Sequence, residues 1–199
     1  MKKIIVFLCV ALCLAGCASK EEELIVQKTE DTAVVMTTEG TDAAIQTTEA
    51  PALIDTATVG EKNALRKAHA YLDFTAFSYT GLIDQLRYEG FTDEEAAYAA
   101  DNCGTDWLYQ AQKKAVSYLD YTAFSYAGLI EQLKYEGFTA EQAAYAADNC
   151  GADWNEQAAR KAASYLELSA FSRQGLIDQL KYEGFTDQQA EYGVTRNGF

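Results

Sequence analysis

One twelve-residue segment occurs three times in the chain at a fixed interval. It reads GLIDQLRYEGFT at 81–92, GLIEQLKYEGFT at 128–139 and GLIDQLKYEGFT at 175–186, so successive copies begin 47 residues apart. Self-similarity at a period of this size is typical of repeat architectures, in which each repeat is one supersecondary unit. The sequence therefore predicts three tandem units of about 47 residues.

Apolar residues inside each unit follow a helical period, and no strand pattern is present. In the second unit they recur at spacings of three and four residues over two stretches: Trp107, Ala111, Ala115, Tyr118 and Leu119, then Tyr126, Leu129, Ile130 and Leu133. A third stretch, 141–149, is rich in alanine. The expected fold class is all-α, with three helices in each helix-turn-helix-like repeat.

Capping residues recur at the expected helix boundaries. Serine precedes each second helix, glycine follows it, and threonine opens each third helix with Glu or Gln three residues later: Ser78, Ser125, Ser172; Gly90, Gly137, Gly184; Thr92, Thr139, Thr186. Such residues satisfy the free backbone groups at helix ends and place the boundaries, but they carry no functional information.

The N-terminus has the layout of an export signal. Lys2 and Lys3 precede an apolar run at 4–14, and LAGC follows at 14–17. This order is typical of a secretory signal peptide and too short for a permanent membrane span. LAGC resembles the lipobox of bacterial lipoproteins, which implies cleavage after residue 16 and lipid attachment to Cys17. The alternative is an ordinary signal peptide that contains a cysteine.

Two or more acyl chains would give Cys17 stable membrane anchoring. We therefore expect the protein at the outer face of the cytoplasmic membrane, exposed at the cell surface. Residues 17–60 are rich in Thr and Glu, lack aromatic residues and contain the single proline. They predict a disordered, lipid-anchored linker. Repeats at 61–107, 108–154 and 155–199 follow, the last as a truncated C-terminal cap.

The charge of the repeats argues against nucleic-acid binding. Residues 61–199 contain 21 acidic and 12 basic side chains, a formal charge of -9. The expected third helix of the first unit, DEEAAYAADN, has four acidic residues and no basic one. Phosphate contacts need Lys and Arg, so we expect no nucleic-acid partner despite the helix-turn-helix outline.

The chain contains none of the usual catalytic arrangements. It shows no Ser-His-Asp set, no metal-ligand spacing and no phosphate loop, so we expect no enzyme activity, cofactor or metal. Cys103 and Cys150 occupy equivalent positions of successive repeats. They predict two small buried thiols or, alternatively, a disulfide, which needs Cα atoms within about 7 Å.

Aromatic residues recur between repeats almost one for one. The first-repeat set is Tyr71, Phe74, Phe77, Tyr88, Phe91 and Tyr98, and the second is Tyr118, Tyr121, Phe124, Tyr135, Phe138 and Tyr145. Small units must bury large groups to be stable, so we expect these rings in the core and between repeats. The alternative is that some of the tyrosine hydroxyls line a groove that accepts a peptide.

The pattern YL…FS..GLI.QL.YEGFT…A.YA.DN…DW at 118–154 resembles the repeat of the Ltp-like host cell surface-exposed lipoproteins. Those are Gram-positive bacterial and prophage lipoproteins with tandem helix-turn-helix-like units. The likeness covers about residues 63–199, and the third unit departs from it at 195–199. The resemblance implies superinfection exclusion, in which a prophage lipoprotein blocks DNA entry of an arriving phage by binding a tail component such as the tape measure protein.

An acidic array of this kind favours a basic or amphipathic protein partner. We expect its acidic surface to be formed by Asp84, Glu131 and Asp178 together with Asp101 and Asp148. Two other functions remain open from the sequence. One is a chromosomal envelope or adhesion lipoprotein that binds host or cell-wall components, and the other is a structural spacer.

Overall fold

The computed structural model describes residues 57–199. The predicted signal peptide, the lipid site at Cys17 and most of the linker lie outside the described residues.

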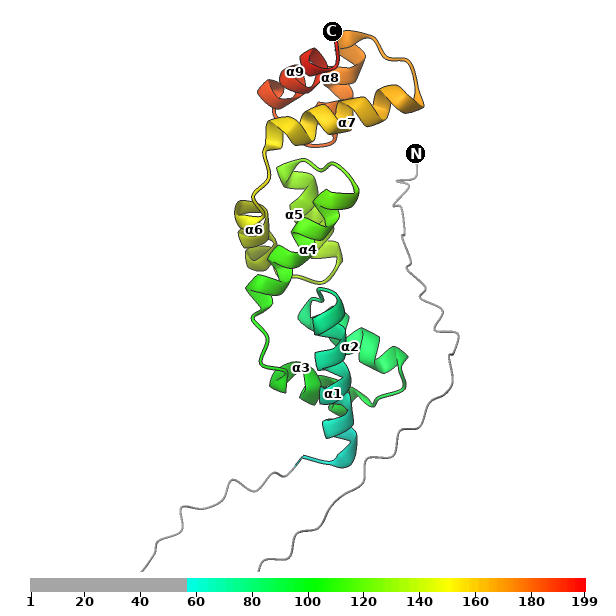
Figure 1. Cartoon of the computed structure of the whole chain (residues 1–199), viewed down its shortest axis with the longest axis vertical. Helices are drawn as coiled ribbons and strands as arrows, with labels where there is room; N and C mark the ends of the chain where they lie inside the picture. The colour runs from blue at the N-terminus through cyan, green and yellow to red at the C-terminus, as the bar shows by residue number, and fades with distance from the viewer. Residues whose placement is uncertain (1–56) are drawn as a thin grey trace, which may run out of the picture. The chain divides into compact units, whose positions relative to one another are not determined.

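The described residues form helices and no strand, in three groups of three along the chain (Figure 1). The first group is α1 (Val59–Phe74), α2 (Tyr79–Tyr88) and α3 (Asp93–Asn102). The second is α4 (Trp107–Tyr121), α5 (Tyr126–Tyr135) and α6 (Ala140–Asn149). The third is α7 (Trp154–Leu168), α8 (Arg173–Tyr182) and α9 (Asp187–Arg196). The predicted all-α fold of three tandem repeats is confirmed.

The predicted capping residues stand at the helix ends. Thr92, Thr139 and Thr186 each form a complete capping box with the Glu or Gln three residues later. Gly90, Gly137 and Gly184 follow the second helices with φ of 93°, 88° and 91°, a left-handed backbone that favours glycine. The third repeat keeps its last helix, because α9 has 10 residues like α3 and α6.

Each repeat has its own hydrophobic core. In the first, Ala64, Ala68 and Leu72 of α1 pack with Leu82 and Leu86 of α2 and with alanines of α3. The second and third repeats bury the equivalent side chains of their own helices. Small side chains at four-residue intervals allow the first and third helices of a repeat to approach closely. The repeats are therefore three separately packed units.

Polar side chains join successive repeats. Ser78 at the start of α2 donates to the Glu136 carbonyl at the end of α5 over 2.6 Å, and Ser125 repeats this bond to the Glu183 carbonyl, also over 2.6 Å. Lys113 of α4 donates back to the Leu72 carbonyl at 3.3 Å. Arg160 of α7 does the same to the Leu119 carbonyl at 2.9 Å. These two hydrogen bonds therefore recur at both junctions.

Tryptophan adds an apolar part to each junction. Trp107, the first residue of α4, packs against the core of the first repeat, and Trp154 packs against the core of the second. Each indole meets a tyrosine edge to face, Tyr79 at 5.5 Å and Tyr126 at 5.4 Å between ring centroids. Cys103 and Cys150 are free thiols.

Candidate partner-binding surface

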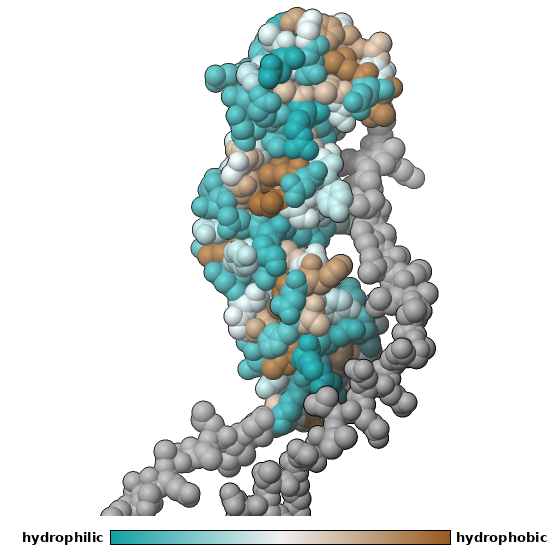
Figure 2. All heavy atoms as spheres, in the orientation of Figure 1, coloured by the Kyte–Doolittle hydropathy of each residue, from teal (hydrophilic) through white to brown (hydrophobic). Residues whose placement is uncertain are grey.

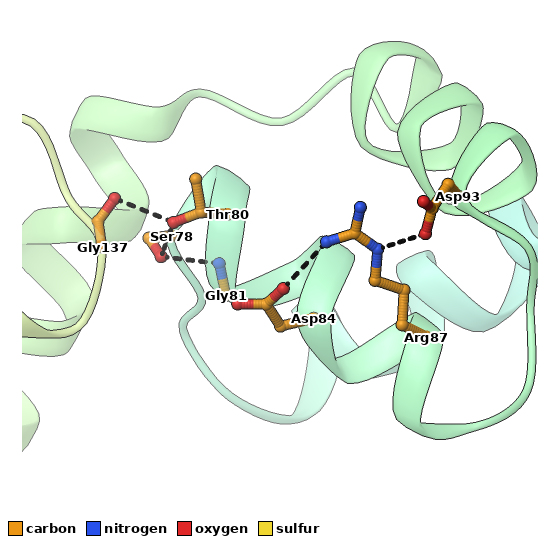
Figure 3. A network of polar contacts seen from close by, with 7 residues as sticks. All are labelled: Ser78, Thr80, Gly81, Asp84, Arg87, Asp93 and Gly137. Carbon is orange, nitrogen blue, oxygen red and sulfur yellow. Dashed lines mark hydrogen bonds and ion pairs between the residues drawn. The ribbon is translucent and has the colours of Figure 1, made fainter.

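The five predicted acidic residues fall into two sets with different surroundings. Asp84 and Glu131 lie at equivalent positions on the exposed sides of α2 and α5. Asp84 pairs with Arg87 at 3.2 Å, and Glu131 pairs with Lys134 at 2.8 Å. Arg87 also binds Asp93 at 2.7 Å, which links α2 to the start of α3 (Figure 3). The two carboxylates raise the pKa of the Arg87 guanidinium, with Asp93 the larger cause.

Asp178 occupies the same position in α8, but its contacts differ. Its carboxylate accepts from the Gln174 amide at 2.9 Å. The neighbouring Lys181 pairs with Asp187 at 2.9 Å, and this bond raises the pKa of the lysine. Asp84, Glu131 and Asp178 thus form an exposed set whose charges are partly balanced by neighbouring bases.

Asp101 and Asp148 form the second set, at the ends of α3 and α6. Asp101 accepts from the Tyr79 hydroxyl at 2.8 Å, and Asp148 accepts from the Tyr126 hydroxyl at 2.9 Å. These bonds raise the pKa of both tyrosines. Because Tyr79 and Tyr126 contact the junction tryptophans, these two aspartates orient residues that hold successive repeats together.

No hydrogen bond or ion pair between described residues joins the two sets. Asp84, Glu131 and Asp178 bond to side chains of their own helices, whereas Asp101 and Asp148 bond to tyrosines that contact the junction tryptophans. The third repeat supports this division. Arg173 replaces the tyrosine there and pairs with Glu191, and Thr195 replaces the aspartate.

A third carboxylate position binds the first helix of each repeat to its second. Glu136 at the end of α5 accepts from the Tyr118 hydroxyl and pairs with Lys114 at 3.1 Å. Glu183 makes the same contacts with Tyr165 and Lys161 in the third repeat. Burial, followed by the bond to Glu136, raises the pKa of Tyr118 well above its usual range. These carboxylates serve the fold.

Two predicted core positions lie outside the core, so the prediction that these rings pack there is wrong for Phe74, Tyr88, Tyr121 and Tyr135. Both positions are 56–87% exposed in all three repeats, and the third repeat has Leu168 and Tyr182 there. Tyr145, also predicted to pack, is 39% exposed. On the face drawn in Figure 2, brown hydrophobic patches are separated by teal hydrophilic ones. Exposed aromatic rings are enriched in binding surfaces relative to the rest of a protein surface.

The phase of the helical pattern identifies these exposed rings. Leu82 and Leu86 mark the buried side of α2, and Tyr88 lies two residues later. Two residues rotate the chain by about 200° around a helix, so this ring points away from the core. Phe74 stands in the same relation to the buried Leu72 of α1.

Within 57–199 no group of three or more His, Cys, Asp or Glu side chains has a metal-binding arrangement. No helix of that range is long and apolar enough to cross a membrane.

These features define an all-α protein built from three tandem helix-turn-helix-like repeats with an acidic surface. The chain belongs to the family described as host cell surface-exposed lipoproteins, whose model matches residues 60–103, 106–150 and 153–196. The three matches correspond to α1–α3, α4–α6 and α7–α9. Searches of curated proteins and of solved structures gave no match.

Proposed function

We propose that this cell-surface lipoprotein acts in superinfection exclusion. Lipid on Cys17 holds it at the outer face of the cytoplasmic membrane. There its repeats bind a protein of an arriving phage, with the tape measure protein as the leading candidate, and the bound phage fails to deliver its DNA. The action is binding, without catalysis or a cofactor.

The observation that carries this proposal is an exposed acidic residue repeated at one position of each repeat. Asp84, Glu131 and Asp178 are all exposed and lie on the second helix of their repeats. With a charge of -9 over 61–199, the array attracts a basic partner and orients it during encounter. Three equivalent positions also provide avidity toward a partner with repeated basic segments.

Exposed rings supply the apolar part of the same proposed surface. Charges at an interface rim chiefly affect association rate, while desolvated aromatic side chains supply most of the affinity. Tyr88, Tyr135 and Tyr182 lie four residues beyond the proposed acids on the same helices, where they are exposed. Residues four apart lie on one face of a helix, so each acid and tyrosine form one contact site.

Expression of the gene in a phage-sensitive host tests the function. We expect normal adsorption of at least one phage, with its DNA entry blocked and plaque formation reduced. A Cys17→Ala variant, which cannot be lipidated, should lose protection. Normal plaque formation by a broad panel of phages would contradict the proposal. Binding to host or cell-wall material in that case would favour the envelope or adhesion function.

A charge-matched pair of variants tests the residues. The test variant converts Asp84, Glu131 and Asp178 to the corresponding amides; Asp101 and Asp148 are left intact because they bond to junction tyrosines. The control converts three other exposed acids, one in each repeat, to amides: Asp73, Asp120 and Glu167. Both variants change the net charge equally. If binding depends on the specific residues and not on net charge, only the test variant should lose protection. Unchanged protection in a folded, surface-displayed test variant would exclude these residues from binding.

A further inference from the structure

The two ends of the repeat array carry complementary halves of the junction that joins its repeats. At each junction a serine of one repeat donates to a glutamate carbonyl of the next repeat, and the phenylalanine two residues after that glutamate is buried. Residues equivalent to these junction residues, offset by 47 positions, also occur on the outer sides of the first and third repeats, where no described repeat contacts them. The first repeat retains the receiving half, and the third retains the donating half.

The receiving half is named for the Glu89 carbonyl, the counterpart of the carbonyls that accept from serine at the junctions. It is called the head face and consists of Arg66, Glu89, Gly90 and Phe91. Arg66 is equivalent to Lys113 and Arg160, which donate to a carbonyl of the preceding repeat. Phe138 and Phe185 are 4% exposed at the two junctions, whereas Phe91 is only partly buried. A methyl group on Gly90 would meet no atom of residues 57–199 within 4 Å, so none of these residues occupies the space beside it.

The donating half, called the tail face, consists of Leu166, Ala170, Ser172 and Gln174. Ala76 and Ala123 are 5% exposed at the junctions and Ser78 and Ser125 are 2% exposed, whereas Ala170 and Ser172 are exposed. The Ser172 hydroxyl accepts from the Gly175 amide at 3.1 Å, as Ser78 accepts from Gly81 at 3.0 Å. Ser172 therefore has the orientation of its junction counterparts, with its own proton available to donate.

Gln174 is the one change among the four tail-face residues, and it is compatible with docking; beside them, Arg173 replaces the tyrosine that contacts the junction tryptophan. Thr80 at this position donates to the Gly137 carbonyl at 3.2 Å, but Ala127 contributes only a methyl group to the second junction. The polar bond is therefore optional. The Gln174 amide is held toward Asp178, four residues along its own helix.

We propose that the tail face of one molecule docks on the head face of a second copy. Ser172 then donates to the Glu89 carbonyl, Arg66 donates to the Leu166 carbonyl, and Phe91 covers Ala170. The occupant is a second copy because the established junctions of this chain use the same residue types. The contact is heterologous, so each added molecule presents a fresh end and the product is an open chain.

The intermolecular junction is weaker than the internal ones. Gly60 stands in the first repeat where the second and third have Trp107 and Trp154, so the apolar anchor is missing. Association between molecules also loses translational freedom that covalent linkage removes in advance. Confinement of a lipoprotein to a surface raises its effective concentration, and assembly therefore depends on surface density.

Lysine cross-linking of the full-length lipidated protein in phosphatidylglycerol vesicles tests the proposal. As surface density rises, we expect a ladder of dimers and longer products. Ser172→Asp keeps the helix cap but removes the donor, and Arg66→Glu reverses the charge on the head face. Each variant alone should reduce the multimers about tenfold or more, equivalent to about 1.4 kcal/mol. Gln188→Glu, an exposed change of equal charge to Ser172→Asp, should leave the ladder unchanged.

Mixing the two variants separates this geometry from a symmetric dimer. The intact head of Ser172→Asp fits the intact tail of Arg66→Glu, so the mixture should form dimers and no longer products. A wild-type protein that remains monomeric at high surface density would overturn the proposal. So would a ladder that survives Ser172→Asp, or a mixture that forms no dimers although both variants are folded.

Discussion

The Ser78 hydroxyl bonds to two repeats at once. Its oxygen accepts from the Gly81 amide at 3.0 Å, which caps α2 (Figure 3). Its proton goes to the Glu136 carbonyl at 2.6 Å, in the next repeat. Only a hydroxyl both accepts and donates at one atom, whereas an ionised carboxylate only accepts. The junction thus explains why serine stands where aspartate would cap equally well.

Replacing Ser78 or Ser125 by Asp should destabilise the protein, although each change keeps a good N-cap. The substitution places a carboxylate beside a part-buried carbonyl that has lost its donor, a cost of about 1–3 kcal/mol. The measurement is urea unfolding followed by circular dichroism. Ser172→Asp is the matched control, since Ser172 is exposed and its cap alone is affected. Equal losses at all three serines would show that the junction bonds contribute nothing.

Removing the Asp101 or Asp148 carboxylate should loosen a junction, whereas removing Asp84 should not. Asp101→Ala leaves the Tyr79 hydroxyl without its acceptor, and we expect a loss of about 0.5–1.5 kcal/mol. Asp84→Ala breaks an exposed ion pair worth about 0–1 kcal/mol. The chain's two tryptophans, Trp107 and Trp154, lie at the junctions, so their fluorescence reports the difference. An unchanged emission spectrum in Asp101→Ala and Asp148→Ala would contradict the structural role of these aspartates.

The repeat number and the helix boundaries could be predicted from the sequence, because both depend on local patterns. Caps such as Thr92 and Gly90 act within a few residues, and the pattern of Leu82 and Leu86 sets the buried face of α2. The separate cores could not be deduced in the same way. Trp107 follows the helical pattern of its own repeat, yet it packs on the core of the preceding one.

The sequence alone predicts which acidic residues recur between the repeats, but not how the structure divides them into two sets. Sequence spacing places Asp84 and Asp101 in one set, because both are acidic and recur in the next repeat. Their separation depends on Tyr79, which reaches Asp101 from 22 residues away. Such pairings follow from how α2 and α3 pack, and no local pattern encodes them.

Gly193→Ala should destabilise the third repeat, although alanine is the better helix former. A Cβ at Gly193 would lie 2.7 Å from the backbone carbonyl oxygen of Ala158, so α9 would have to move away from α7. Overpacking of this kind costs about 1–3 kcal/mol, which exceeds the gain in helix propensity. Thermal unfolding by circular dichroism measures the effect, and Gln188→Ala on the exposed side of α9 serves as the control. A rise in melting temperature for Gly193→Ala would contradict the close approach of the two helices.

Ionisation of Tyr165 should weaken the protein at alkaline pH. Burial, followed by the bond to Glu183, raises the pKa of this tyrosine to about 12 in the folded chain. The same side chain has a pKa of about 10 when unfolded. The unfolded state therefore loses the proton first, and the stabilising contribution of neutral Tyr165 is full below pH 10 and is lost as pH rises toward 12.

The Tyr165→Phe variant tests this prediction. Its free energy of unfolding, measured in urea from pH 8 to 11, should decline less with rising pH than that of the wild type. Ionised tyrosine absorbs at 295 nm, so the wild-type titration minus that of Tyr165→Phe reports Tyr165 alone. In the folded protein the midpoint of this difference should lie near pH 12. Tyr182→Phe, an exposed tyrosine of the same repeat, controls for the number of phenols. A difference spectrum for Tyr165 centred near pH 10 in folded protein would show that its hydroxyl is not held by Glu183.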